Sequence, residues 1–288
     1  MISRIKEALN LFQKGQLNES KEICFEILKN QADSFDALYL SGMIAFRQRE
    51  YIKSEESIRK AINLRSNNAE IYNVYAIVLL HLKKFNLAIE NWNKAIKLRP
   101  DYLEAYNNRG NLLLELGKTT EALKNYEKAI ELKPDFAEAY NNLGNALLKL
   151  KKIDSALKSY EKAINLMPNY YQAYHNIGRA FYERNKKNEE LKSYEKSSKF
   201  SSDIESALKN YKKALEIKPD FAEAYFDLGS IFSELNKNDV AIEYYEKAIR
   251  SKKEFEAKLG TLIHTKLKLC DWSTIEKDLK DVENKIIN

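Results

Sequence analysis

An eight-residue segment, KPDFAEAY, occurs twice in the chain, at residues 133–140 and again at residues 218–225. Such an identity within one sequence indicates internal repetition. Four prolines follow the same spacing, at Pro100, Pro134, Pro168 and Pro219. The first two gaps between them are 34 residues long, and the third is 51, which is one and a half periods. A period of 34 predicts a chain built from repeated pairs of helices.

Small residues and an aromatic residue recur with the same period. We predict a small residue in the middle of the first helix of each repeat, and two alanines seven residues apart on the second helix, with an aromatic residue between them. The small residues let the two helices approach closely, and the aromatic ring fills the remaining space. The positions are Gly42, Ala76, Gly110, Gly144, Gly178 and Gly229 for the first series, Ala88, Ala122, Ala156, Ala207 and Ala241 for the second, Ala61, Ala95, Ala129, Ala163, Ala214 and Ala248 for the third, and Trp92, Tyr126, Tyr160, Tyr211 and Tyr245 for the aromatic.

Each Pro-Asp pair predicts a junction between helices. A helix usually ends before the residue that precedes proline. The aspartate and the glutamate three residues later form the pattern of a capping box, which begins the next helix. We expect these boxes at Asp101 with Glu104, Asp135 with Glu138, and Asp220 with Glu223.

The composition also favours helices, because Gly (8) and Pro (4) are scarce among 288 residues and no alternating strand pattern is present. The repeats resemble the tetratricopeptide repeat family. The residues that match its pattern in order are Tyr140, Leu143, Gly144, Leu147, Ala156, Tyr160, Ala163 and Pro168. The resemblance implies an all-α solenoid, a right-handed superhelix of antiparallel helix pairs.

We predict a superhelix over residues 1–255 and an atypical C-terminal helical pair, a cap or a junction, over residues 256–288. The predicted repeats span 1–34, 35–68, 69–102, 103–136, 137–170, 171–221 and 222–255. The first two are degenerate, since Ser20 and Ser54 stand where alanine is usual, and Ala32 and Ser66 where proline is usual.

The repeat at 171–221 contains a 17-residue half-repeat near residues 186–202. The second helix is written twice there, as LKSYEKS at 191–197 and LKNYKKA at 208–214. Only the second copy carries both packing alanines, so we expect it to pack in the stack. The first copy is then an extra helix or a bulge, either a neutral duplication or a functional lip.

Polar residues recur on the first helices, which line the concave face of a solenoid. An asparagine amide carries a donor and an acceptor, so a row of amides can hold the backbone of an extended peptide. We predict a peptide-binding site made of Asn73, Asn107, Asn108, Asn111, Asn141, Asn142, Asn145, Asn176, Arg179 and Asp227. His175 and Ser230 complete two of the rows. The alternatives are that these asparagines are only solvated, or that basic residues such as Arg109 and Arg179 clamp a carboxylate.

The C-terminal segment around Cys270, Asp271 and Trp272 allows two interpretations. The tryptophan of a final amphipathic pair can cover the end of the last core. The segment also resembles the junction that leads into the glycosyltransferase of O-linked N-acetylglucosamine transferase-like proteins. That resemblance implies a substrate-recruiting arm whose catalytic domain is absent from this chain. The partner expected in either case is a protein or an extended peptide.

Other functions are disfavoured. The net charge is +6, but basic and acidic residues alternate, so no nucleic-acid patch is predicted. No apolar run is long enough for a membrane span. The GKTT segment at 117–120 lacks the first glycine of a phosphate loop, and His81, His175 and His264 lack ligand spacing. We therefore expect no active site, no metal and no cofactor. Two distant cysteines and the absence of a signal peptide predict a cytoplasmic protein.

Overall fold

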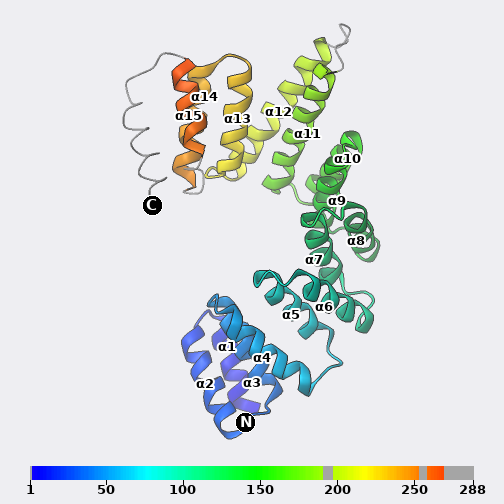
Figure 1. Ribbon diagram of the computed structural model, residues 1–288, viewed down its shortest axis with the longest axis vertical. Helices are drawn as coiled ribbons and strands as arrows, with labels where there is room; N and C mark the ends of the chain where they lie inside the picture. Colours follow the sequence, from blue (N-terminus) through cyan, green and yellow to red (C-terminus); the bar gives the residue numbers. More distant parts are fainter. Residues whose placement is uncertain (1, 191–196, 253–257, 269–288) are drawn as a thin grey trace. The chain divides into compact units, whose positions relative to one another are not determined.

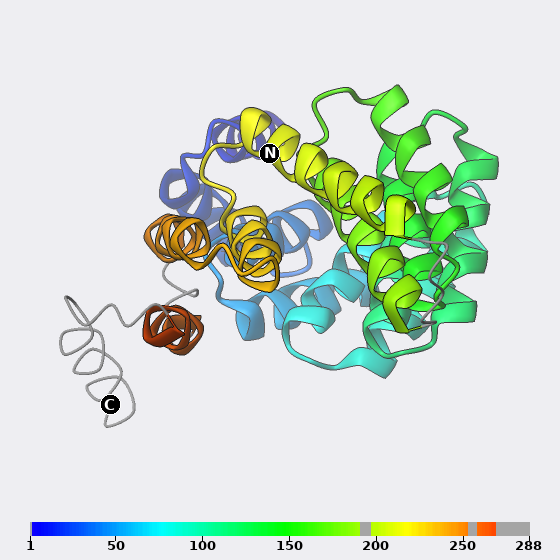
Figure 2. The same cartoon turned by 90° about the horizontal axis from the view of Figure 1, so that it is seen from above.

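The computed structural model describes residues 2–190, 197–252 and 258–268. These residues form fifteen α-helices and no strand. The chain divides into two compact units, which are an N-terminal unit of residues 1–134 and a C-terminal unit of residues 135–288. In both units, the described helices form antiparallel pairs whose members lie side by side (Figures 1 and 2).

The N-terminal unit contains four helix pairs. They are α1 (Ile2–Gln13) with α2 (Leu17–Asn30), α3 (Phe35–Arg47) with α4 (Tyr51–Leu64), α5 (Ala69–His81) with α6 (Phe85–Leu98), and α7 (Leu103–Glu115) with α8 (Thr119–Leu132). One hydrophobic cluster is formed by residues of the five helices α3, α4, α5, α6 and α7, and it includes Ile58, Leu79 and Trp92. A second cluster joins α1, α2 and α3 around Phe12 and Ile44.

The described residues of the C-terminal unit form three further pairs and a single helix. They are α9 (Ala137–Lys149) with α10 (Ile153–Leu166), α11 (Tyr171–Glu190) with α12 (Ser197–Ile217), α13 (Ala222–Glu234) with α14 (Asn238–Ser251), and α15 (Leu259–Lys268). Leu262 and Ile263 of α15 pack against Ala241 and Tyr245 of α14. Cys270 and Trp272, on which the cap and junction interpretations rest, lie outside the described residues, as does the predicted boundary at residue 255.

Close contact between a small residue and an aromatic ring joins the helices of a pair. A Cβ atom added at Gly110 would lie 2.7 Å from Tyr126 Cε1, and one at Gly178 would lie 2.7 Å from Tyr211 Cε1. Tyr126, Tyr160 and Tyr211 are 0% exposed. The predicted roles of the glycine and aromatic series are therefore confirmed, and Tyr211, in the second copy of the duplicated helix, packs against Gly178.

The degenerate positions in the first two repeats have a physical explanation. Ser20 and Ser54 are 0% exposed. The Ser20 hydroxyl donates a 2.7 Å hydrogen bond to the carbonyl oxygen of Ala8, and the Ser54 hydroxyl a 2.8 Å bond to that of Gly42. Serine replaces alanine at these positions because its hydroxyl reaches a carbonyl of the partner helix.

The predicted capping boxes are wrong. Helices α7, α9 and α13 begin one residue later than expected, so their N-cap residues are Tyr102, Phe136 and Phe221, whose side chains make no capping hydrogen bond. The aspartates lie instead in the turn before the cap. At the first junction, the Tyr102 N–H donates to the Arg99 carbonyl oxygen, which closes a turn over Pro100 and Asp101.

The 17 additional residues lengthen one helix pair. Helices α11 and α12 have 20 and 21 residues, against 13 and 14 in α9 and α10. The connection 191–196, which carries most of the first copy, lies outside the described residues. Arg184 of α11 pairs with Asp203 of α12 through two hydrogen bonds of 2.6 and 3.0 Å, and with Asp154 of α10 at 3.0 Å. These contacts connect α11 both to α12 and to α10 of the preceding pair.

Candidate peptide-binding faces

The predicted site residues lie on the first helices of the pairs. In the N-terminal unit, α5 carries Asn73, and α7 carries Asn107, Asn108 and Asn111. In the C-terminal unit, α9 carries Asn141, Asn142 and Asn145, α11 carries Asn176 and Arg179, and α13 carries Asp227. Because successive pairs repeat the same geometry, residues at equivalent positions form rows within each unit, 34 residues apart except for the 51 residues between Asn176 and Asp227.

Four of these asparagines are buried between helices. Asn73, Asn107, Asn141 and Asn176 are 7, 3, 4 and 7% exposed. The Trp92 indole N–H donates to Asn73 Oδ1 at 3.0 Å, and Asn176 Nδ2 donates to Asn141 Oδ1 at 2.9 Å. A buried polar group needs such a partner, so these amides hold neighbouring helices in register.

The remaining residues are more accessible. Asn111 and Arg179 are exposed, and Asn108, Asn142, Asn145 and Asp227 are half-buried. Two of these amides are held by tyrosines of the second helix. The Tyr126 hydroxyl donates to Asn111 Oδ1 and the Tyr160 hydroxyl to Asn145 Oδ1, both at 2.8 Å. Because the oxygen accepts from tyrosine, the amide nitrogen is the donor that each side chain can offer to a ligand.

The pattern changes at α11, where Arg179 replaces asparagine. Tyr211 occupies the position of Tyr126 and Tyr160, but an arginine cannot accept its proton. The Tyr211 hydroxyl oxygen is buried and has no hydrogen-bond partner among the described residues. Burial, and then the nearby Asp227 carboxylate, raise the pKa of Tyr211. The polar face therefore changes from neutral amides to charged groups at this helix.

A histidine–aspartate pair follows on the same face. His175 Nε2 lies 3.0 Å from Asp227 Oδ2, and the imidazole is 9% exposed. The imidazole packs edge-on against the Phe221 ring at 4.9 Å. This pair occupies the position at which Asn176 bonds to Asn141 one repeat earlier.

The carboxylate clamp has little support from Arg109. Its guanidinium donates to Asn125 Oδ1 at 2.8 Å and also to Asn93 Oδ1. Burial lowers the pKa of Arg109. This arginine is therefore used to brace α7 against α6 and α8.

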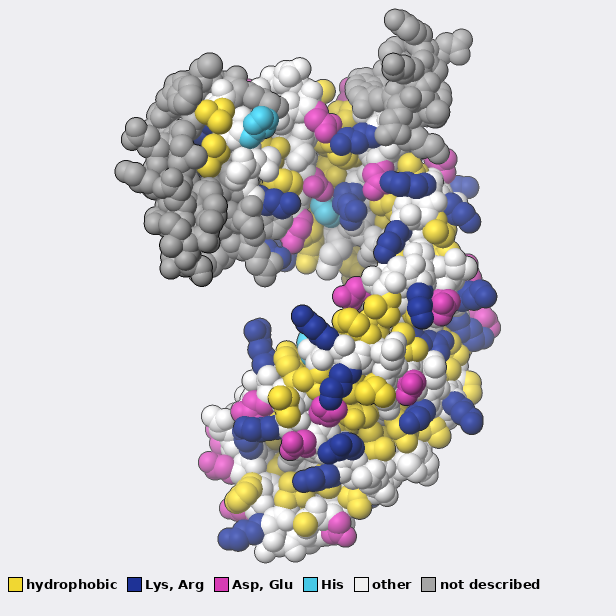
Figure 3. All heavy atoms as spheres, in the orientation of Figure 1, with side chains coloured by type: hydrophobic (Ala, Val, Ile, Leu, Met, Phe, Trp, Pro, Cys, Tyr) yellow, Lys and Arg dark blue, Asp and Glu magenta, His cyan; other side chains and the backbone are white. Residues whose placement is uncertain are grey.

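Other chemistry receives no support from the described part of the chain. There, no group of three or more His, Cys, Asp or Glu side chains is arranged to hold a metal ion. His81 stacks on Tyr51 with ring centroids 4.8 Å apart. No described helix combines the length and apolar character needed to cross a membrane. Figure 3 shows basic and acidic side chains interspersed on the face in view.

Comparison with known families decides the classification. Profiles described as TPR repeat match residues 76–117, 110–151 and 201–235, and profiles described as tetratricopeptide repeat match residues 35–68, 137–170 and 222–255. Together these matches span well over half of the chain. The chain belongs to the tetratricopeptide repeat (TPR) family. Its all-α solenoid fold was correctly predicted from the spacing of small residues, aromatic residues and prolines.

Solved TPR structures share the fold. A tetratricopeptide repeat protein from Parabacteroides merdae superposes with a TM-score of 0.72 at 17% identity, covering 91% of this chain and 98% of that one. YrrB, described as a TPR protein with an unusual peptide-binding site, superposes with a TM-score of 0.52 at 24% identity, covering 60% of this chain and 89% of that one. At these identities the likeness concerns the fold alone.

A curated plant protein matches part of the TPR chain. The probable UDP-N-acetylglucosamine–peptide N-acetylglucosaminyltransferase SPINDLY of Hordeum vulgare is 40% identical over 50 residues, which are 17% of this chain. The match spans 5% of the length of that relative.

The sequence pattern predicted that the tyrosine rings fill space between helices, but it did not predict that their hydroxyls bond to asparagines. A signal was present, because Tyr126 follows Asn111 and Tyr160 follows Asn145 at the same separation of 15 residues. In a helix–turn–helix repeat, that separation places the two side chains on facing helices.

Proposed function

We propose that this TPR chain is a protein-interaction scaffold that binds an extended peptide on the polar faces of its first helices. The observation that carries the proposal is the fixed orientation of the Asn111 and Asn145 amides by tyrosine hydroxyls. Amides that are already held in place lose little conformational freedom when they bind a ligand, which favours affinity.

The chemistry suits a peptide backbone. Amide nitrogens at Asn108, Asn111, Asn142 and Asn145 can donate to carbonyl oxygens, which every peptide presents whatever its side chains. Such contacts give affinity with little sequence selectivity. In the C-terminal unit, Arg179 and the His175–Asp227 pair add charge beside the amides of α9. These groups favour a peptide that presents charged side chains to α11 and α13.

The test begins with peptides selected from a random-sequence phage library against the purified chain. Their affinity is then measured by calorimetry for the wild type, for Asn111→Asp and for Asn145→Asp, one variant in each unit, which keep the oxygens that accept from Tyr126 and Tyr160 but lose the amide donors. The control is Asn165→Asp, since Asn165 is an exposed asparagine on the second helix α10. We expect the variant on the face that holds the peptide to bind about twofold to tenfold more weakly, because one hydrogen bond is lost. The control variant should bind like the wild type.

Two results would contradict the proposal. One is a selection that yields no binding peptide. The other is an unchanged dissociation constant in both Asn111→Asp and Asn145→Asp. Asn176→Ala is unsuitable for this test because the Asn176 amide donates to Asn141 and is 7% exposed. Its removal changes the packing of α11 on α9 as well as the face.

A second candidate function is the substrate-recruiting arm of a protein glycosyltransferase whose catalytic domain lies outside this chain. The 40% identity to the SPINDLY relative over 50 residues favours it. The test is the intact mass of the native gene product. A species much larger than 33.6 kDa supports the arm, whereas a species of that mass contradicts it. Sugar transfer from UDP-N-acetylglucosamine by the purified chain would contradict our expectation that it holds no active site.

A further inference from the structure

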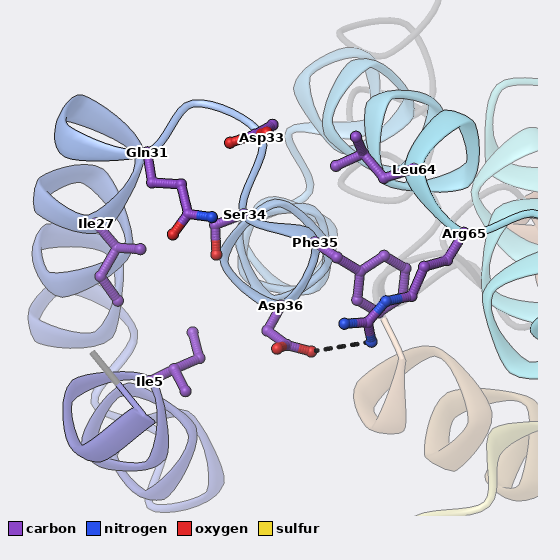
Figure 4. A pocket seen from close by; sticks show the side chains of 9 residues that line it. All are labelled: Ile5, Ile27, Gln31, Asp33, Ser34, Phe35, Asp36, Leu64 and Arg65. Carbon is purple, nitrogen blue, oxygen red and sulfur yellow. Dashed lines mark ion pairs between the residues drawn. The ribbon is translucent and has the colours of Figure 1, made fainter.

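The N-terminal unit contains a pocket that no asparagine of the proposed faces lines. It has a volume of about 400 Å³ and lies between α1, the end of α2, the start of α3 and the end of α4 (Figure 4). Its apolar walls come from Ile5, Ile27, Leu64 and the Phe35 ring, and Ser34 also lines it. The volume falls within the range of roughly 300–1,000 Å³ that is usual for ligand sites.

The pocket has a cause in the repeat pattern. Ser34 is the residue immediately before the first helix of its repeat. In four later repeats this position holds an aromatic residue, namely Tyr102, Phe136, Tyr170 and Phe221. Tyr102 is 7% exposed and belongs to the core, and the Arg99 guanidinium lies 3.4 Å above its ring. With serine at position 34, the chain supplies no ring there.

The surroundings correspond residue by residue. Two repeats, or 68 residues, later in the chain, the positions of Ser34, Ile5 and Gln31 are occupied by Tyr102, Asn73 and Arg99. Asn73 and Arg99 are among the groups that influence the pKa of Tyr102, so they lie close to its ring. In the repeat between them, Asn68 holds the aromatic position and instead caps α5 by accepting from the Glu70 and Ile71 N–H groups.

The backbone at Ser34 already has the conformation that the aromatic residues adopt. Its φ and ψ angles are −69° and 105°, against −78° and 84° at Tyr102 and −81° and 89° at Phe221. The Ser34 side chain makes no capping hydrogen bond. An aromatic side chain introduced at this position would therefore enter the pocket, just as Tyr102 enters the hydrophobic core two repeats later.

We propose that this pocket binds an aromatic side chain of a partner polypeptide, in the place that the chain's own tyrosine or phenylalanine fills in later repeats. The Arg65 guanidinium lies 4.3 Å above the Phe35 ring and gives the pocket a planar wall for stacking. Asp33 and Asp36 are exposed and line the pocket. Asp36 forms a 3.9 Å ion pair with Arg65 (Figure 4), and the charge of Asp33 favours a lysine or arginine beside the aromatic residue.

A neighbouring hollow extends the site. It has a volume of about 280 Å³, shares Ile5 and Asp36 with the pocket, and is lined by Leu9, Tyr39 and Met43. Burial raises the pKa of Tyr39 to about 12. An apolar side chain that follows the aromatic anchor can lie there along α1 and α3.

The test uses capped pentapeptides of sequence Ala-Lys-Phe-Lys-Ala, with leucine or alanine in the central position as comparison probes. Binding is measured by calorimetry with the full chain and two variants. Ser34→Tyr fills the pocket with the residue found at position 102, and Ser34→Ala leaves it open. We expect the phenylalanine peptide to bind the wild type and Ser34→Ala equally, and Ser34→Tyr about tenfold or more weakly.

Methyl NMR of the wild type provides a second measurement that does not depend on the folding of a variant. The phenylalanine peptide should shift the methyl signals of Ile5, Ile27 and Leu64. The proposal is overturned if the peptide does not bind, if the leucine peptide binds as tightly, if these methyl signals do not move, or if Ser34→Tyr binds like the wild type. The pocket and the asparagine faces share no residue, so failure here is distinct from failure of the proposed function.

Discussion

The Tyr160 hydroxyl donates a 2.8 Å hydrogen bond to Asn145 Oδ1, and Tyr211, at the corresponding place one repeat later, has no such partner among the described residues. Both rings are 0% exposed. The two tyrosines therefore serve the same packing role but differ in whether the hydroxyl is satisfied.

This difference predicts opposite results for the same substitution. Tyr160→Phe should lower the free energy of unfolding by about 1 kcal/mol, since it removes a hydrogen bond. Tyr211→Phe should be neutral or stabilising, since it removes a buried hydroxyl that makes no bond. Urea denaturation measures both. As a size control, Tyr160→Ala should cost roughly 3–5 kcal/mol through the cavity it leaves. Equal losses in the two phenylalanine variants would contradict this interpretation of the hydroxyls.

Gly110→Ala should destabilise the chain by about 1–3 kcal/mol, because the new methyl group would lie 2.7 Å from the Tyr126 ring. Gly260 is the matched control. It lies in α15 with no atom within 4 Å of its Cβ position, so Gly260→Ala should stabilise by roughly 0.5–1 kcal/mol through helix propensity. Thermal denaturation followed by circular dichroism ranks the two. The close-approach explanation fails if Gly110→Ala is as stable as the wild type.

Arg184→Ala should cost about 3–5 kcal/mol, because Asp203 is 2% exposed and would be left as a buried, unpaired carboxylate. The double variant Arg184→Met/Asp203→Leu should recover most of this loss, since it removes both charges. Chemical denaturation of the three proteins provides the measurement. If the single and double variants lose the same stability, the ion pair does not hold the lengthened pair α11 and α12 together.

Burial raises the pKa of the Cys24 thiol to about 11. In the unfolded chain the thiol ionises near its ordinary pKa of about 8.5. Between these values the unfolded chain binds fewer protons than the folded one, so stability should fall as pH rises through this window. Cys24→Ala should lower stability near neutral pH and show a shallower decline above it. An equal decline in both proteins would assign the effect to other groups.

The repeat architecture could be predicted because its determinants are periodic. Gly110 and Tyr126, for example, recur at the same places in other repeats, and each fixes a helix contact. The predicted helix starts failed at Asp101 because a Pro-Asp turn and a capping box have similar sequence patterns. The burial of Asn107 beside the half-buried Asn108 could not be predicted, because adjacent residues of one type differ only in helix rotation. The pocket at Ser34 could not be predicted, because a serine in place of an aromatic residue indicates a pocket only once Tyr102 is known to be buried.

The central claim is that the asparagine faces bind a peptide backbone. Its most direct test is the ¹H–¹⁵N spectrum of the side-chain amides, recorded with and without a phage-selected peptide. We predict that the signals of one face, either Asn108 and Asn111 or Asn142 and Asn145, shift on binding, while those of the exposed Asn10 and Asn165 remain unchanged. Binding that leaves all four face amides unshifted would contradict the account.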